Sequence, residues 1–229
     1  MTRGVTITAD LEPDQQPRRW DDHVALYEEV FEPLTQRFSA AAIDVLAPRP
    51  RSHVLDSGAG AGGAALELAR RGHRVTAIDA SMAMVARIRQ RASAAGLPVE
   101  ALPMDGQDLA FSDASFDAAL SVLGSLPARP LPAQLRFRER NDFQALFAAA
   151  GLPPAEISEV TAELVAPSPA WLAERLAFAP GMAALLEGFG AAEPEVLAAF
   201  RSRLEAMHGA ERLALSGCAW LGSVTVAAT

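Results

Sequence analysis

Residues 54–63, with the sequence V-L-D-S-G-A-G-A-G-G, combine an apolar run with one acid and four glycines. Closely spaced glycines let a chain turn sharply and let a ligand approach the backbone, as in cofactor-binding loops between a strand and a helix. Two spacings fit this stretch. Gly58, Gly60 and Gly62 give G-x-G-x-G, whereas Gly58, Gly60 and Gly63 give the G-x-G-x-x-G of dinucleotide sites. The glycines alone leave the choice between these ligands open.

Three acidic residues at the ends of predicted strands bear on this choice. Asp56 precedes Gly58 by two positions, where a pyrophosphate would repel a carboxylate and a cationic ligand group would attract one. Asp79 lies 21 positions after Gly58 and could accept hydrogen bonds from both hydroxyls of a ribose, which both kinds of ligand contain. Asp105 and Gly106 could read the amino group and a ring nitrogen of an adenine. Asp56 and Asp105 therefore favour an adenosyl ligand with a cationic end over a dinucleotide.

Alternating strands and helices are predicted around these residues, and they position the acids at one edge of a sheet. Hydrophobic runs predict strands at 53–56, 74–79, 99–104 and 116–123. Helices are predicted at 64–71 and from an N-cap at Ser81 to Ala95, and a glycine ends each of them. This alternation predicts parallel βαβ units in an α/β, Rossmann-like, doubly wound and mostly parallel sheet, with helices on both faces.

The flanking segments predict a helical lid before and after this core. Residues 18–46 have helical periodicity that Pro33 divides into two helices. The elements predicted after the core are a helix from Asn141 up to Gly151, antiparallel edge strands at 155–164 and 219–228, and helices at 168–178, 180–189 and 194–207. We expect a flexible tail (1–17) and one domain (18–229), made of an N-terminal helical lid (18–47), a cofactor-binding core (48–124), an irregular segment (125–140) and a C-terminal part (141–229) with a helical insertion (168–210).

The composition argues against several classes of protein. The chain has 229 residues, 50% of them hydrophobic, and a net charge of −8, which indicates a globular protein without the basic surface that nucleic acids require. The N-terminal residues lack an apolar segment and no run of about 18 apolar residues occurs, so we expect neither a secretory signal nor a membrane span. A single cysteine, Cys218, is typical of a cytoplasmic protein. All 20 basic residues are Arg, which excludes a Schiff-base or P-loop lysine.

Taken together, the motifs resemble the class I S-adenosylmethionine-dependent methyltransferases, specifically the small-molecule type with the methyltransferase domain 11/25 pattern. The matching stretches are W-D-D-H-V-A-L-Y at 20–27, V-L-D-S-G-A-G-A-G at 54–62, A-I-D-A-S-M-A-M at 77–84, D-G-Q-D-L-A-F at 105–111 and S-F-D-A-A-L-S-V-L-G at 115–124. Their order and separations make the resemblance specific over residues 20–124. A weaker likeness extends from Leu135 to the end of the chain.

The resemblance implies S-adenosyl-L-methionine as the cofactor and relates each motif to one part of it. Gly58, Gly60 and Gly62 would face the methionyl part, whose ammonium group Asp56 would hold. Asp79 would hold the ribose. The resemblance also implies that Ser121 lies near the sulfonium and that Tyr27 closes over the cofactor. The residues that it places around the adenine are Ala80, Met82, Asp105 and Gly106.

Catalysis by such a site depends mainly on alignment, because methyl transfer from a sulfonium is an in-line displacement that needs aligned atoms and a dry site. A general base is needed only for an acceptor whose proton must leave. His23 is the candidate base because it precedes Tyr27 by one helical turn and would share its face. The competing interpretations are a solvent-facing His23 and a Tyr27 that only packs in the core. No cluster of His, Asp and Glu has metal-ligand spacing, so no metal is expected.

Residues 125–140 depart from the family pattern. After its fourth strand the family has a helix, a turn and a fifth strand, which need more than these sixteen residues with their three prolines. We therefore expect the fifth strand to be deleted or reduced to Gln134–Phe137. The expected function is methyl transfer to a hydroxyl, amine or carbon of a small-molecule substrate. The alternatives are a non-methylating relative that binds the cofactor or a partner, and an NAD-dependent oxidoreductase, which Gly63 alone favours.

Overall fold

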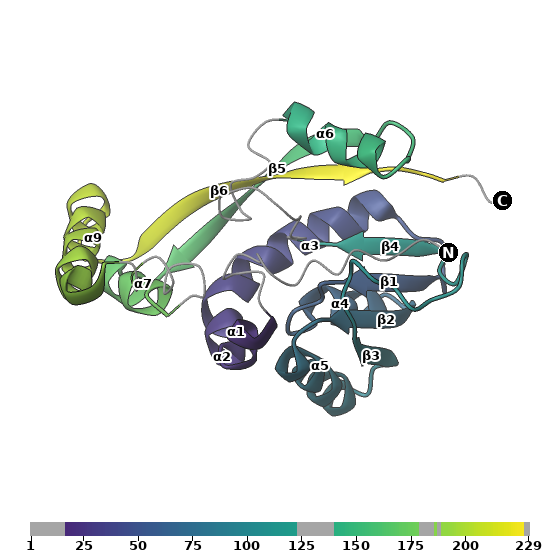
Figure 1. Ribbon diagram of the computed structural model, residues 1–229, viewed down its shortest axis with the longest axis horizontal. Helices are drawn as coiled ribbons and strands as arrows, with labels where there is room; N and C mark the ends of the chain where they lie inside the picture. The colour runs from purple at the N-terminus through teal and green to yellow at the C-terminus, as the bar shows by residue number, and fades with distance from the viewer. Residues whose placement is uncertain (1–16, 123–139, 179–185, 187–188, 227–229) are drawn as a thin grey trace.

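The computed structural model describes residues 17–122, 140–178, 186 and 189–226, and Figure 1 shows their arrangement. The N-terminal elements are α1 (Pro17–Asp21), α2 (Val24–Leu26), a π-helical turn (Tyr27–Phe31) and α3 (Glu32–Leu46). The next elements are β1 (His53–Ser57), α4 (Gly63–Arg70), β2 (Arg74–Asp79), α5 (Met82–Ala95), β3 (Val99–Pro103) and β4 (Ala118–Ser121). The C-terminal part contains α6 (Arg140–Ala149), β5 (Glu156–Ala166), α7 (Pro169–Leu176), a 3-10 turn (Gly190–Ala192), α9 (Glu193–His208) and β6 (Leu213–Ser223).

Strands β1 to β4 form one parallel sheet in the order β3-β2-β1-β4, which confirms the predicted Rossmann-like α/β class. Because the four strands run in one direction, their carboxyl ends share one edge of the sheet. The register pairs Ser57 with Ile78 on one side and with Ser121 on the other. On the far side of β2, Asp79 pairs with Pro103. The predicted acids of the first two strands therefore lie at the same edge.

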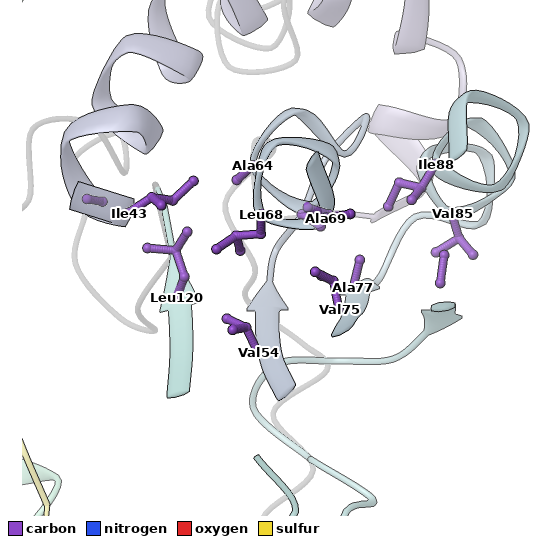
Figure 2. Close-up of a cluster of buried hydrophobic side chains, with 14 residues drawn as sticks. Ile43, Val54, Ala64, Leu68, Ala69, Val75, Ala77, Val85, Ile88 and Leu120 are labelled. Atoms are coloured by element: carbon purple, nitrogen blue, oxygen red, sulfur yellow. The ribbon is translucent and has the colours of Figure 1, made fainter. Parts of the chain in front are cut away.

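A hydrophobic core fills the space between this sheet and helices α3, α4 and α5 (Figure 2). Val54 and Val75 are fully buried in it, against Leu68 of α4. The apolar periodicity of the three helices and the uninterrupted apolar runs of the strands both follow from this packing. The core fixes the strand ends, and hence the site, on a rigid base.

The connection from β3 to β4, residues 104–117, contains no helix, whereas a doubly wound sheet led us to expect helices on both faces. Its short polar side chains bind nearby backbone groups instead: Gln107 N donates to Asp105 Oδ1 (2.9 Å), and Ser115 Oγ donates to the carbonyl of Ser112 (2.6 Å). Such local bonds favour turns over helix. Among the described residues, the helices of the parallel sheet thus cover one face. The segment proposed for a reduced fifth strand, 134–137, lies outside the described residues, as does most of the predicted helix at 180–189.

The antiparallel strands β5 and β6 pair only with each other and form a separate two-stranded sheet. Helices pack on its two faces where glycines leave room: α3 lies beside Gly217, and Phe143 and Phe147 of α6 lie against Gly222. In Figure 1 this ribbon extends from α7 and α9 to α6. The predicted start of the last strand at residue 219 was wrong, because β6 begins at Leu213. Pairing with β5 continues through Gly217, which in the sequence alone resembles a strand break.

Pro33 lies in the first turn of α3, but it does not divide the helical backbone as predicted; the break among the N-terminal helices lies between Asp21 and Val24. The π-helical turn joins α2 to α3 without a gap in the helical backbone. Among the described residues, no helix combines the length and apolar character that crossing a bilayer would require.

Candidate functional site

The glycine loop after β1 requires glycine at three positions for its backbone conformation. Gly58, Gly60 and Gly62 have φ angles of 70°, 55° and 90°, a region that costs little only for glycine. The amides of Gly58 and Ala59 both donate to the carbonyl of Ile78, each at 3.0 Å. These bonds hold the loop against the end of β2, next to Asp79.

The space around each glycine distinguishes the two motifs that fit the sequence. A methyl group added at Gly58 would meet no atom within 4 Å, so this backbone is open to a ligand. At Gly63, which has no positive φ, an added methyl group would lie 3.0 Å from Glu32 Oε1 and 3.1 Å from Gln36 Cγ. Gly63 is therefore explained by the close approach of α3. Gly62 is also covered, since a methyl group added there would lie 2.9 Å from Ile88, but its φ of 90° requires glycine, so the backbone conformation favours the G-x-G-x-G pattern.

Asp56 is a buried acid with an unused hydrogen-bonding position. Its side chain lies in β1, the residue is 2% exposed, and its Oδ2 has no hydrogen-bond partner among the described residues. Burial, opposed by a hydrogen bond from the amide of Ala65 and assisted by the nearby charge of Asp79, raises the pKa of Asp56 to about 7. A buried carboxylate without a partner is costly. A cationic ligand group in the adjoining cavity would supply that partner.

Asp79, at the end of β2, holds the loop and the next helix in place. Its Oδ2 accepts from Gly60 N (2.8 Å) and its Oδ1 from Ser81 N (2.9 Å). Burial raises the pKa of Asp79, and these two N–H groups oppose the rise. Ser81 caps α5 as predicted, accepting from Met84 N at 3.2 Å. Each carboxylate oxygen of Asp79 can still accept a second hydrogen bond, which a ribose would supply.

The residues predicted around the adenine lie on the exposed side of the same edge. Ala80 and Met82 follow β2 directly, and the apolar side chain of Met82 is 61% exposed. Asp105 is exposed in the tight turn after β3. A methyl group added at Gly106 would lie 2.8 Å from Ser57 Oγ, so this turn packs on the end of β1. These four residues of the β2 and β3 loops, like Ser121 at the exposed end of β4, thus belong to the predicted edge.

Tyr27 lies on the glycine loop. A methyl group added at Gly60 would be 2.9 Å from both Cζ and Oη of Tyr27, and the Tyr27 hydroxyl is 3.3 Å from Thr35 Oγ1. Burial raises the pKa of Tyr27 to about 12. The ring also packs against Trp20 and Phe31, with centroid distances of 6.0 and 6.5 Å. Both interpretations of Tyr27, contact with the cofactor loop and packing, therefore agree with its position.

His23 lies in the turn before α2 with φ −120° and ψ 17°, outside the helical region. The argument that placed it on the helical face of Tyr27 assumed one continuous helix, which the structure does not have. The backbone carbonyl of His23 still accepts from Tyr27 N at 2.9 Å. Its role as a base remains a prediction.

A small cavity, with room for about one or two water molecules, lies between α3 and the glycine loop. Its lining includes Asp56 and Gly58 on one side and a polar stripe of α3 on the other. The stripe consists of Glu32, Thr35, Gln36 and Ser39, which the sequence analysis missed. The signal was present, because polar residues at i, i+3, i+4 and i+7 share one face of a helix. Glu32, Thr35 and Ser39 are buried, and buried polar residues on one face of a helix that packs against a core indicate a site.

The donor set fits an adenosyl amino acid and gives no indication of a metal. Among the described residues, no group of three or more His, Cys, Asp and Glu side chains could hold a metal ion. Asp56 offers a buried acceptor to an ammonium group, Gly58 offers open backbone, and Asp79 offers acceptors to a ribose.

Comparison with known proteins agrees with this geometry. Residues 54–149 match the family described as methyltransferase domain. A protein-L-isoaspartate O-methyltransferase of Methylorubrum extorquens is 43% identical over 102 residues, 44% of this chain and 45% of that protein. The uncharacterized protein Rv1403c of Mycobacterium tuberculosis is 34% identical over 103 residues, 45% of this chain and 36% of that protein. The chain thus spans less than half the length of these curated relatives.

The fold has a counterpart among solved structures. The YcgJ protein of Bacillus subtilis superimposes with a TM-score of 0.53 at 14% identity, covering 83% of this chain and 98% of that one. At this identity the likeness concerns the fold alone. The family match thus relates residues 54–149, which include the glycine loop and the acids at the strand ends, to methyltransferase domains.

Proposed function

We propose that this protein transfers the methyl group of S-adenosylmethionine to a small-molecule acceptor. The observation that carries the proposal is Asp56, a buried carboxyl that lines the cavity beside an open glycine backbone and whose Oδ2 has no hydrogen-bond partner among the described residues. A buried acceptor of this kind suits the ammonium group of an amino-acid cofactor and repels a pyrophosphate. The NAD alternative loses its support, since Gly63 is explained by packing of α3.

The proposed arrangement follows the strand ends. Asp56 would hold the ammonium group, Gly58 and Gly60 would contact the methionyl chain, and Asp79 would accept from the ribose hydroxyls. The other contacts proposed are Met82 and Ala80 on an adenine face, Asp105 and Gly106 at the adenine edge, Gly62 and Tyr27 at the methionyl part, and Ser121 near the sulfur.

The chemistry divides between the cofactor and the protein. When bound, the cofactor supplies an electrophilic methyl group on a sulfonium. The protein holds that group at the carboxyl edge of the sheet, orients the acceptor and keeps water away. For a hydroxyl or ammonium acceptor, we propose that His23 receives the proton, directly or through water. A carbon or thiolate acceptor would not need it.

A small acceptor is supported by the covered position of the site. The N-terminal helices lie over the glycine loop, and the turn Tyr27–Phe31 packs against α7 through an apolar cluster that includes Val30 and Leu172. An ion pair between Arg175 Nε and Glu29 Oε1 (2.9 Å) adds to this contact. A site under helices admits a small molecule more readily than the surface of a folded protein. The relative named for protein isoaspartate methylation makes a peptide acceptor the main competitor.

Calorimetric titration with S-adenosylmethionine, S-adenosylhomocysteine and NAD tests the cofactor. We expect binding of the first two and none of NAD, and Asp113→Asn, at an exposed acid outside the proposed site, serves as the control for Asp56→Asn. Transfer of a labelled methyl group to phenols, amines and hydroxylated small molecules tests the acceptor, with an isoaspartyl peptide as the protein-type arm. Methylation of the peptide alone would contradict the small-molecule proposal. Binding without transfer to any acceptor would favour the non-methylating alternative.

A further inference from the structure

The N-terminal lid segment, residues 17–32, is fastened along helix α5 by charged side chains, and Figure 1 shows α1 and α2 beside α5. At its start, Asp21 Oδ1 accepts from Ser81 Oγ (2.6 Å) and from Ala83 N (3.0 Å). The lid segment is thereby anchored at the N-terminus of α5. This anchor lies beside Asp79, at the predicted ribose end of the site.

Three further contacts hold the other end of the lid segment against α5. Arg87 Nε lies 2.7 Å from Glu28 Oε1, and one guanidinium nitrogen of Arg91 lies 2.6 Å from Glu32 Oε1 and 3.4 Å from Glu28 Oε1. We call these four side chains the latch. They form a balanced set of two carboxylates and two guanidinium groups. The pair of Glu32 and Arg91 is the more buried, with side-chain exposures of 8% and 23%.

The latch also contacts the glycine loop itself. The same nitrogen of Arg91 donates to the carbonyl of Ala61 at 2.8 Å. Tyr27 directly precedes Glu28, and its ring lies on Gly60. A closed latch therefore keeps the ring of Tyr27 on the backbone that a methionyl group would contact.

The closed lid leaves too little room for the cofactor's amino-acid end. The space between Tyr27, Glu32 and Asp56 admits only about one or two water molecules. An adenosyl amino acid is many times larger than this space. Tyr27 therefore has to move away from Gly60 before the methionyl part of the cofactor can enter. Partly exposed ion pairs are individually weak, which allows such a segment to open without unfolding the core.

We propose that the latch formed by Glu28, Glu32, Arg87 and Arg91 holds Tyr27 on the glycine loop, and that opening of the latch sets the rate of cofactor entry. This inference rests on the proposed function, because it assumes that the cofactor enters between Tyr27 and Asp56. These four residues are positioning residues, acting through Tyr27 and the loop. A substitution of Arg87 should open the latch without destabilising the fold, because Arg87 lines neither the cavity nor the core.

The fluorescence of Trp20 can report the position of the lid segment, because its ring centroid is 6.0 Å from that of Tyr27. We suggest a background in which the other two tryptophans, Trp171 and Trp220, are replaced by Phe. Quenching of Trp20 fluorescence by acrylamide then measures opening of the lid without any ligand. Stopped-flow mixing with S-adenosylhomocysteine measures the association and dissociation rates in the same protein.

The variant Arg87→Gln should increase acrylamide quenching of Trp20 and raise both rates about twofold to fivefold, the factor expected for one lost, partly exposed ion pair. The matched control is Arg201→Gln, which removes one charge from an exposed pair with Glu205 on α9 and should change neither readout. Arg87→Lys keeps the charge and should restore the slower rates. A thermal scan of each variant checks that the fold is retained.

Unchanged quenching in Arg87→Gln would overturn the proposal, as would an equal increase in Arg201→Gln. Increased quenching without faster association would overturn the role in cofactor entry. If the unmodified protein binds no S-adenosylhomocysteine, the proposed function fails, and the quenching result still decides whether the latch closes the lid.

Discussion

The two sheets of this protein differ in how they are stabilised. In the parallel sheet, Val54, Val75 and Ile78 are completely buried between helices and neighbouring strands. In the β5–β6 ribbon most strand residues are exposed or half-buried, and Leu213 and Ala166 are exceptions at one end. The family match covers 54–149 and ends before β5. The recognisable chemistry therefore belongs to the part with the larger core.

This difference has a physical basis in the geometry of the site. Residues at the ends of several strands can bind one cofactor only if those ends keep fixed relative positions. A buried parallel sheet holds them in such positions. An acceptor pocket has to suit one substrate, and a ribbon with attached helices can change without disturbing the strand ends. We expect mutations in the two parts to have separable effects on stability and cofactor binding.

The largest expected effect tests the difference in core size. Leu68→Ala, at a fully buried position of α4, should lower the free energy of unfolding by about 2–5 kcal/mol because it leaves a cavity in a close-packed core. The matched change Leu215→Ala, at a half-buried position of β6, should cost less than half as much. Urea denaturation of both variants measures this. Equal losses would show that the ribbon is as tightly packed as the parallel sheet.

Asp56→Asn should stabilise the cofactor-free protein at pH 8 by roughly 1–3 kcal/mol, because the buried charge is removed. The folded-state pKa of about 7 lies above the ordinary 3.8, so between these values the unfolded chain has lost a proton that the folded protein keeps. Stability from this group therefore falls as pH rises from about 4 to about 7 and is constant above that. The gain in the variant should be absent at pH 4.

Unfolding of both proteins at a series of pH values checks the prediction for Asp56. The same variant should bind S-adenosylhomocysteine more weakly, so that stability and affinity change in opposite directions. A variant that loses both would indicate that Asp56 has only a structural role.

Asp79→Ala should weaken binding of S-adenosylhomocysteine by roughly 1–3 kcal/mol, because the ribose loses a charged acceptor and Gly60 N loses its own. Calorimetric titration measures the change. The control is Asp113→Ala, at an exposed acid in the β3–β4 connection, for which no change is expected. Equal affinities of Asp79→Ala and the unmodified protein would remove Asp79 from the site.

The smallest expected effect concerns Gly63 and the contact between the core and α3. Gly63→Ala should lower the free energy of unfolding by less than about 1 kcal/mol, because alanine favours the helix while its methyl group crowds Glu32 and Gln36. Gly62→Ala should cost more, since it combines a φ of 90° with a contact 2.9 Å from Ile88. Thermal unfolding compares the two. A change in affinity for NAD in the Gly63→Ala variant would indicate that Gly63 takes part in binding a dinucleotide.

Much of the cofactor half could be predicted because its signals are local. Strands at 53–57 and 74–79 are short apolar runs, and the helix from Met82 to Ala95 begins at the predicted Ser81 cap and ends at Gly96. Glycine caps and capping hydroxyls act within one turn of the chain, so the sequence contains the whole interaction. The acids at strand ends follow from the same periodicity.

Most of the missed features depend on partners distant in sequence. The start of β6 at Leu213 depends on pairing with β5, and the polar stripe of α3 has a role only because α3 lies opposite Asp56. The break before α2 that separates His23 from the helix of Tyr27 has no strong local signal. The latch likewise joins Glu28 and Arg87, 59 positions apart.

By itself, the sequence determined which loop turns on glycine, where the parallel strands end and which acids stand there, because these depend on backbone conformation and on neighbours a few residues away. Only the tertiary structure decided that Gly63 accommodates α3, that Oδ2 of Asp56 is buried with no partner among the described residues, and that Tyr27 lies on the loop. Burial and close approach arise when separate segments pack together, and a linear pattern does not contain them.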